Sequence, residues 1–348
     1  MNHIRHSFAL LLLAGTFVLM LPGCDLVGLT GGESDETLLY PVRLNDRWGY
    51  INQKGRMVIE PEFQSARAFE DGLAAVRNNY SWGFIDASGE LVIEARFEEA
   101  RSFSEGLAAV RVDGRWGYID RSGSFVLNPQ FTDARPFSDG RAFVRMPDYR
   151  WEYIDSNGSV IRQESTPRFQ EVGNPDFSDG LALFRTGNDQ YGYIDRNGAP
   201  VIPAQFSAAL EFSDGRAAIK ISDRWGFIDT RQQTVINPQF ISANSFSEDL
   251  APVRQNGNQW GYADERGAIA IAPQFDEARP FREGRAAVLV GDKWGFVDTR
   301  GNAILAPTFN DVQDFHNGLA RVRVDIGENQ SRYGYIDRNG SYVWFPTD

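Results

Sequence analysis

Hydrophobic and polar residues alternate in short runs along most of the chain. A representative stretch is LAAVRVDGRWGYIDRSGSFVLNPQF, residues 107–131, which is rich in Val, Ile, Phe, Tyr and Trp. Alternation of this kind predicts strands rather than a helix. We expect three strands in this stretch, at 107–112, 115–120 and 124–127. Pro129 should end the third strand because it has no N–H to donate to a ladder, and the QFTDARPFSDG that follows should link one unit to the next.

The same pattern recurs as a tandem repeat. An aromatic residue, followed by glycine in all copies but one, returns nine times at intervals of 34 to 40 residues, and a second signature such as FSEGLAAV at 103–110 lies between copies. The copies cover residues 38–348 and predict nine three-stranded antiparallel units of about 34–35 residues each. The Trp-Gly positions of the repeat are Trp48, Gly49, Trp82, Gly83, Trp116, Gly117, Trp225, Gly226, Trp260, Gly261, Trp294 and Gly295.

The turn after the middle strand has its own signature. Asp120 lies three residues before Gly123, where its short carboxylate can accept backbone N–H bonds and the glycine can supply a positive φ. The copy that begins at Asp229 has Gln232 in place of that glycine. We therefore expect its turn to be strained or reshaped.

The Trp-Gly pair predicts packing between sheets. In the middle strand Trp116 and Tyr118 point to one face, whereas Gly117 points to the other. Apolar groups on both faces mean that each sheet is buried on both sides, by the units before and after it. We expect the glycine to leave a gap that an aromatic ring from an adjacent strand or unit fills.

These residues closely resemble the WG-repeat (KWG-type) family of bacterial proteins, whose units share the pattern W-G-[YF]-I-D…G…V-I-x-P-x-F…F-x-[ED]-G-L-A-x-V. The resemblance covers residues 38–348. It implies an all-β repeat array of cell-envelope or secreted proteins, and it supplies no catalytic residues.

Two architectures bury sheets on both faces, an open superhelical solenoid and a closed β-propeller. Closed rings usually complete one blade with strands from both ends of the chain. Here the first unit starts with its own first strand, LLYPVRL, and the last ends with its third, SYVWF. Because no unit is split, the favoured expectation is the open solenoid, with the closed propeller as the alternative.

Residues 1–23 are predicted to be a signal peptide, with an apolar stretch, FALLLLAGTFVLML, that is too short to span a bilayer. The stretch ends in LPGC, which resembles the lipobox of bacterial lipoproteins and implies cleavage before Cys24, with lipid attached to it. Asp25 resembles a signal for retention at the inner membrane, so the periplasmic side of that membrane is favoured, with the outer membrane or cell surface as alternatives. Residues 24–37 are expected to form a flexible lipidated tether.

Composition narrows the possible functions. Lys and Arg sum to 35 against 47 Asp and Glu, and the net charge of −12 argues against a nucleic-acid partner. His316 is the only histidine and Cys24 the only cysteine of the expected mature chain, so nucleophilic catalysis with His and His-rich metal sites lack the residues they need. The acidic residues recur at the same place in every unit, which indicates structural roles. We therefore predict no catalytic, cofactor or metal site.

Departures from the repeat are the candidate binding positions. They comprise the replacement of glycine after Trp151, an insertion near 161–177 and a long turn at 324–334, and the candidate residues are Glu152, Arg162, Glu164, His316 and Asn329. The favoured function is a non-catalytic envelope lipoprotein that serves as a repeat scaffold for an unknown protein or peptide partner. The alternatives are a glycan- or peptidoglycan-binding module and, less favoured, a carboxylate-based hydrolase.

Overall fold

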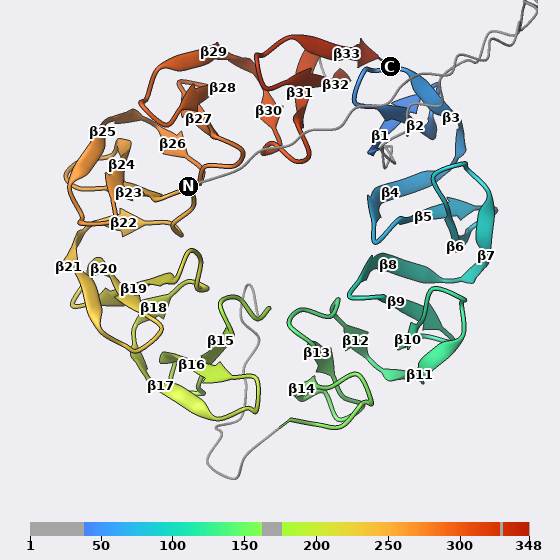
Figure 1. The fold of residues 1–348 in the computed structure, drawn as a ribbon, viewed down its shortest axis with the longest axis horizontal. Helices are drawn as coiled ribbons and strands as arrows, with labels where there is room; N and C mark the ends of the chain where they lie inside the picture. The colour runs from blue at the N-terminus through green and yellow to red at the C-terminus, as the bar shows by residue number, and fades with distance from the viewer. Residues whose placement is uncertain (1–37, 162–175, 328–329, 348) are drawn as a thin grey trace, which may run out of the picture. The chain divides into compact units, whose positions relative to one another are not determined.

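The computed structural model describes residues 38–161, 176–327 and 330–347. The regular secondary structure in these ranges consists of strands, and they contain no helix long and apolar enough to cross a membrane. The strands form nine antiparallel sheets that follow one another in chain order, and we number these sheets blades 1 to 9. Figure 1 shows the blades arranged in a ring, with the last strand of most blades at the circumference.

A complete blade has four strands, which we call inner, second, third and outer in chain order. The inner strands are β4 (Ser65–Glu70), β8 (Glu99–Ser104), β12 (Asp133–Ala134), β18 (Ala208–Ala209), β22 (Ser242–Ala243), β26 (Glu277–Ala278) and β30 (Asp311–Val312). The second strands are β1 (Leu39–Leu44), β5 (Leu73–Asn78), β9 (Leu107–Val112), β13 (Ala142–Arg145), β15 (Leu181–Arg185), β19 (Arg216–Ile221), β23 (Leu250–Arg254), β27 (Arg285–Val290) and β31 (Leu319–Gly327).

The third strands are β2 (Arg47–Asn52), β6 (Ser81–Ile85), β10 (Arg115–Ile119), β14 (Trp151–Ile154), β16 (Tyr191–Asp195), β20 (Arg224–Asp229), β24 (Trp260–Asp264), β28 (Lys293–Asp298) and β32 (Gln330–Asp337). The outer strands are β3 (Met57–Phe63), β7 (Leu91–Phe97), β11 (Phe125–Phe131), β17 (Pro200–Phe206), β21 (Thr234–Phe240), β25 (Ile269–Phe275), β29 (Ala303–Phe309) and β33 (Tyr342–Thr347). Among the described residues, blades 1 and 5 have no inner strand and blade 4 has no outer strand.

Seven blades contain an inner strand that the sequence analysis did not predict. In blade 3 this strand is β8, which pairs with β9 through Glu99 opposite Arg111 and Ala100 opposite Val110. It comes from the segment interpreted above as a link between units, so the prediction of three-stranded units is wrong for these blades. Five of the seven inner strands are only two residues long, too short for an alternating pattern to show in the sequence.

The outer strand of blade 3 also differs from the prediction. β11 passes through Pro129, which does not end the strand. The pairing between β10 and β11 shifts register on either side of Tyr118. An irregular strand at the edge of a sheet is a place where a residue without an N–H is tolerated.

The glycine of the Trp-Gly pair lies against backbone, not against an aromatic ring. A Cβ on Gly117 would lie 2.5 Å from the carbonyl oxygen of Leu127 and 2.8 Å from the nitrogen of Pro129, both in the outer strand of the same blade. The expected gap for a ring from the adjacent unit is therefore wrong. The same close approach to an outer strand recurs at Gly49, Gly83, Gly192, Gly226, Gly261 and Gly295.

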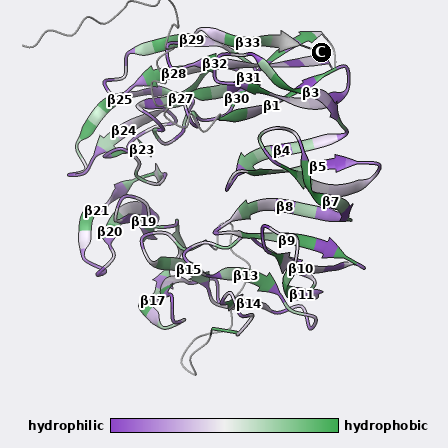
Figure 2. Ribbon diagram, turned by 45° about the vertical axis from the view of Figure 1, so that its right-hand side comes forward, coloured by the Kyte–Doolittle hydropathy of each residue, from purple (hydrophilic) through white to green (hydrophobic). Residues whose placement is uncertain are grey.

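Contact between blades depends instead on the aromatic residue two positions after each repeat Trp. Tyr118 of blade 3 meets Phe137 of the F-S-D-G turn of blade 4 edge to face, with ring centroids 4.8 Å apart, and its hydroxyl donates to the carbonyl of Arg135 at 2.7 Å. Such contacts join the hydrophobic core across neighbouring blades, and Figure 2 shows hydrophobic residues in the strands around the ring. The equivalent pairs are Tyr50–Phe69, Phe84–Phe103, Tyr153–Phe177, Tyr193–Phe212, Phe227–Phe246, Tyr262–Phe281 and Phe296–Phe315.

The first and last blades meet by the same contact. Tyr335 of blade 9 packs edge to face on Tyr40 of blade 1, with centroids 5.6 Å apart, and its hydroxyl donates to the carbonyl of Pro41 at 2.9 Å. Leu319 and Ile51 join them in a single buried cluster. The ring is therefore closed, and the fold is a nine-bladed β-propeller.

The expectation of an open solenoid is wrong, and the closed alternative is the observed architecture. That expectation assumed that closure requires a blade built from both ends of the chain. Here each described sheet uses one continuous part of the chain. Closure needs only that Tyr40, from β1, take the place that Phe occupies at the other contacts between blades.

The turn between the third and outer strands matches its prediction. The carboxylate of Asp120 accepts backbone N–H bonds from Ser122 at 2.9 Å and Ser124 at 3.1 Å, and Gly123 has a φ of 81°. Gln232 holds a φ of 63° in the copy without glycine, and its N–H still donates to the carbonyl of Asp229 at 2.9 Å. The turn at Gln232 is thus strained but not reshaped.

We expect Gln232→Gly to stabilise the protein by about 0.5 to 1 kcal/mol, because glycine relieves the left-handed strain and retains the backbone bonds. The free energy of unfolding in urea measures this change. Gln233→Gly is the matched control, since Gln233 has no positive φ, and it should give no gain. A gain of equal size from both variants would contradict the assignment of strain to Gln232.

Candidate binding surfaces

The ring has two ends that carry different turns. Because the strands of a blade are antiparallel, the turns that join inner to second strands and third to outer strands lie at one end. The turns that join second to third strands lie at the other. We call the first the FxDG end, after the turn motif at residues such as 137–140, and the second the tyrosine end, after Tyr80 and Tyr149.

Acidic side chains at the FxDG end connect one blade to the next. The carboxylate of Glu105 in blade 3 accepts the backbone N–H of Gly140 in blade 4 at 2.8 Å. Glu105 itself has a φ of 55°. The same bond recurs from Gly106 to Asp71, Gly215 to Asp179, Gly284 to Glu248 and Gly318 to Glu283. These carboxylates therefore have a structural role, as the repeated spacing indicates.

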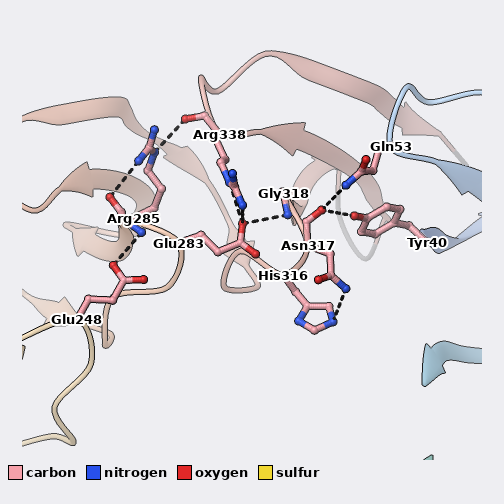
Figure 3. A network of polar contacts seen from close by, with 10 residues as sticks. Tyr40, Gln53, Glu248, Glu283, Arg285, His316, Asn317, Gly318 and Arg338 are labelled. Carbon is pink, nitrogen blue, oxygen red and sulfur yellow. Dashed lines mark hydrogen bonds and ion pairs between the residues drawn. The ribbon is translucent and has the colours of Figure 1, made fainter. Parts of the chain in front are cut away.

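Figure 3 shows how this chain of bonds ends where the ring closes. Glu283 accepts the N–H of Gly318 at 2.9 Å and also two bonds from the guanidinium of Arg338, at 2.9 and 2.7 Å. The backbone carbonyl of Asn317 accepts bonds from the hydroxyl of Tyr40 and from Nε2 of Gln53, the latter at 2.8 Å. Asn317 thus joins blade 9 to blade 1.

The candidate His316 lies beside this closing contact. Its ring is exposed, and its Nε2 lies 3.1 Å from Nδ2 of Asn317. In the described part of the chain, no group of three or more His, Cys, Asp or Glu residues is placed to hold a metal ion.

Arginines of the inner-strand segments cover the repeat tryptophans. The guanidinium of Arg101 lies 4.9 Å from the ring centroid of Trp116 and donates to Asp133 of the next blade at 2.8 Å. Arg279 lies 4.3 Å from the Trp294 ring and donates to a carbonyl of blade 9. These arginines are paired across blades and stacked on a ring, so they do not form a free basic patch.

The pKa values of Asp314, near Arg279, and of Asp120, in a turn, are shifted in opposite directions. Burial raises the pKa of Asp314, although Arg279 opposes that effect. In the exposed turn, the hydroxyl of Ser122 holds the pKa of Asp120 below its usual value, so Asp120 is ionised at neutral pH. Asp120 is therefore a poor candidate for a proton donor in hydrolysis.

The tyrosine end carries two aromatic side chains that project into solvent. Tyr80, in the turn before β6, is 85% exposed, and Tyr149, in the turn before β14, is 66% exposed. Both have a positive φ, of 70° and 66°. The Trp-Gly positions and loop lengths of the copies carry no signal for these two residues; the signal is the type of residue two positions before each repeat aromatic residue.

Blade 9 has a hairpin at the same end that is longer than its counterparts. β31 has nine residues and β32 eight, and the pairing extends through Asp325 opposite Ser331 to Gly327 opposite Gln330. Ser331 donates to Asp325 at 2.7 Å, and Ile326 is 46% exposed. A hollow of about 30 Å³ at its base, large enough for a water molecule, is lined by Asp311, Val312, Gln313, Arg321, Val322, Arg323 and Tyr333.

Of the sequence candidates within the described residues, Glu152 is buried, with 7% of its surface exposed. It occupies the glycine position of β14, where a Cβ excludes an outer strand placed as in blade 3. Arg162, Glu164 and Asn329 lie outside the described residues, as does most of the insertion. The structure therefore does not bring the sequence candidates together: Glu152 lies in blade 4, and His316 lies at the closing contact.

Taken together, the repeated blades, the shared interblade contacts and the closed ring define a repeat β-propeller. The family described as WG containing repeat matches this chain at residues 48–81, 82–116, 116–151, 191–225, 225–258, 260–294 and 294–325. These segments make up more than half of the sequence, and the chain belongs to the WG-repeat family.

Comparison with other proteins adds two structural likenesses. The computationally designed Ika8 protein shares 10% identity, with 89% of this chain and 99% of that chain covered and a TM-score of 0.48. BamB from Moraxella catarrhalis shares 14% identity, with 82% of this chain and 92% of that chain covered and a TM-score of 0.43. None of the curated proteins compared with the sequence matches it.

Proposed function

We propose that this WG-repeat propeller is a non-catalytic scaffold of the bacterial cell envelope that binds a protein partner through the long hairpin of blade 9. The observation that carries the proposal is the extension of β31 and β32 beyond the other second and third strands, with Ile326 exposed near its tip. The hairpin is ordered by backbone pairing and by the Ser331–Asp325 bond, so it can present a fixed surface to a partner.

The absence of catalysis is part of the same proposal. Its support is that repeated carboxylates are already bonded, either to turn N–H groups as at Asp120 or to the next blade as at Glu105. A hydrolase would need a pair of carboxyl groups free to act on a substrate. The family match and the fold are consistent with a scaffold and assign no reaction.

Site-specific photo-crosslinking in intact cells tests the hairpin. A photoreactive amino acid at Ile326 should yield a discrete crosslinked protein, whereas the same residue at Val290, which is 45% exposed in blade 8, should not. The captured protein, once purified, should lose binding to a variant in which residues 325–331 are replaced by Asp-Gly, the turn of blade 3. Equal crosslinking at both positions, or full binding to the shortened variant, would refute the proposal.

We also propose that Cys24 carries the lipid that tethers the ring to a membrane, on the periplasmic side of the inner membrane. The support is the LPGC sequence after an apolar stretch, followed by Asp25. We expect Cys24→Ser to abolish incorporation of radiolabelled palmitate and to release the chain from the membrane fraction, because one residue supplies the acylation site. Persistent label in the variant would show that the chain is lipidated elsewhere or anchored without lipid.

A further inference from the structure

Tyr80 and Tyr149 each lie two residues before the repeat Trp, in blades 2 and 4, and each has a positive φ, although the turn of blade 4 is one residue longer than that of blade 2. In blades 1, 3 and 6 that position holds Asp46, Gly114 and Asp223, with φ values of 61°, 72° and 66°. Glycine adopts this left-handed backbone freely, and aspartate is enriched there, but a bulky side chain is disfavoured. The backbone of these turns therefore disfavours tyrosine, yet two of the turns contain one.

Packing compensates for little of the strain. Tyr80 is 85% exposed, and no described residue stacks on its ring. Its backbone N–H donates to Oε1 of Gln64 at 3.3 Å, a bond that any residue other than proline could make. Tyr149 is 66% exposed and has the guanidinium of Arg145 at 4.9 Å from its ring. Strain that stability does not explain points to a binding role for the side chains.

The surroundings of the two rings indicate the class of ligand. No other large hydrophobic residue is exposed in the second-to-third-strand turns of blades 2 to 4, which are all described. The neighbouring exposed groups are polar or charged, including Asn79, Asp113 and the Asp148–Arg150 ion pair. A protein partner is disfavoured, because the residues that dominate protein–protein binding lie in contiguous, desolvated apolar patches. Single-stranded nucleic acid is disfavoured, because it needs a positively charged groove and the net charge of the chain is −12.

An isolated aromatic face within a hydrogen-bonding surface suits a ligand that has a flat apolar face and a polar rim. A hexose ring has this shape, with C–H bonds on its face and hydroxyls at its edge. We propose that Tyr80 and Tyr149 are stacking platforms for sugar rings of a polysaccharide that binds along blades 2 to 4 at the tyrosine end. This site is separate from the blade 9 hairpin, so it goes beyond the protein-binding function proposed above.

Binding of defined glycans tests the site. The probes are hexasaccharides of β-linked glucose and of β-linked N-acetylglucosamine, measured by calorimetry with the mature chain, together with co-sedimentation on purified peptidoglycan sacculi. We expect at least one probe to bind, with Tyr80→Gly and Tyr149→Gly each weakening the affinity about tenfold, as for an interface residue that contributes more than 1 kcal/mol. The shortened blade 9 hairpin should leave this binding unchanged.

The melting temperature of the variants distinguishes a binding role of the two tyrosines from a structural role. Tyr80→Gly should raise the melting temperature by about 1 to 3 °C while it reduces glycan binding, because glycine suits the left-handed turn. Asp223→Gly, at the same position in blade 6, is the matched control and should leave binding intact. The proposal is overturned if no probe binds, if neither tyrosine variant weakens binding, or if the tyrosines prove to be needed only for a protein partner.

Discussion

Gly117→Ala is expected to destabilise the protein by about 3 kcal/mol, at the upper end of the range for an overpacked interior. The added Cβ would lie 2.5 Å from the carbonyl oxygen of Leu127 and 2.8 Å from the nitrogen of Pro129. Both atoms belong to backbone, which cannot move aside as a flexible side chain can. Relief requires β11 to separate from β10, which exposes Leu127 and Phe131 to water.

The free energy of unfolding from urea titration of the mature chain measures the effect. Gly187→Ala is a matched control, because Gly187 has no positive φ and a Cβ there meets nothing within 4 Å. The control should change stability by no more than about 0.5 kcal/mol. Equal stability of the two variants would show that the outer strand can shift at little cost and that steric contact does not require the repeat glycine.

Tyr335→Ala is expected to cost about 3 to 5 kcal/mol, the usual range for removing a large buried aromatic side chain. The substitution removes the edge-to-face contact with Tyr40 and the hydroxyl bond to Pro41, and it leaves a cavity between blades 9 and 1. This contact closes the ring, so the variant also tests the architecture directly.

Tyr193→Ala provides the comparison, because Tyr193 makes the same contact between blades 5 and 6, with Phe212 at 4.7 Å and a bond to the carbonyl of Leu210 at 2.6 Å. In a closed ring the two substitutions should cost similar amounts in urea titrations. In an open array Tyr335 would be on an end surface, and its loss would cost little. Tyr335→Phe should retain the ring contact and lose only about 1 kcal/mol with the hydroxyl bond.

Local features of the fold could be predicted from sequence because their causes are local. The pairing of Asp120 with a glycine three residues later defines a turn whose bonds all lie within five residues, and the alternating pattern at 107–112 matches β9 in full. The all-β repeat follows from the same local signals. These features need no knowledge of which blades are neighbours.

Closure could not be predicted in this way, because it depends on one side chain in a different sequence context. Tyr40 makes the contact between blades that the Phe of the F-x-[DE]-G motif makes elsewhere in the ring. It lies in a second strand, however, and no such motif surrounds it. The inner strands were missed because most contain two residues, and their pairing is specified by the neighbouring second strand rather than by their own pattern.

The candidate surfaces show the same limit. The blade 9 hairpin could be identified from sequence, because its longer strands increase the spacing between repeats. Tyr80 sits in a turn of ordinary length, and only its backbone conformation and exposure mark it as unusual. Comparing the residue two positions before each repeat aromatic residue across the copies would have identified both tyrosines, since the other copies hold Asp, Asn, Gly or Ser there.

The contact that joins Tyr335 to Tyr40 also bears on how the protein comes apart. In a linear array the terminal repeat has one neighbour, and fraying can begin there and propagate. Around this ring every blade has two neighbours, so no blade can be released unless two interfaces break. Resistance to unfolding then depends on the activation barrier for releasing the first blade. The half-life of the folded ring therefore describes its kinetic stability better than an equilibrium constant does.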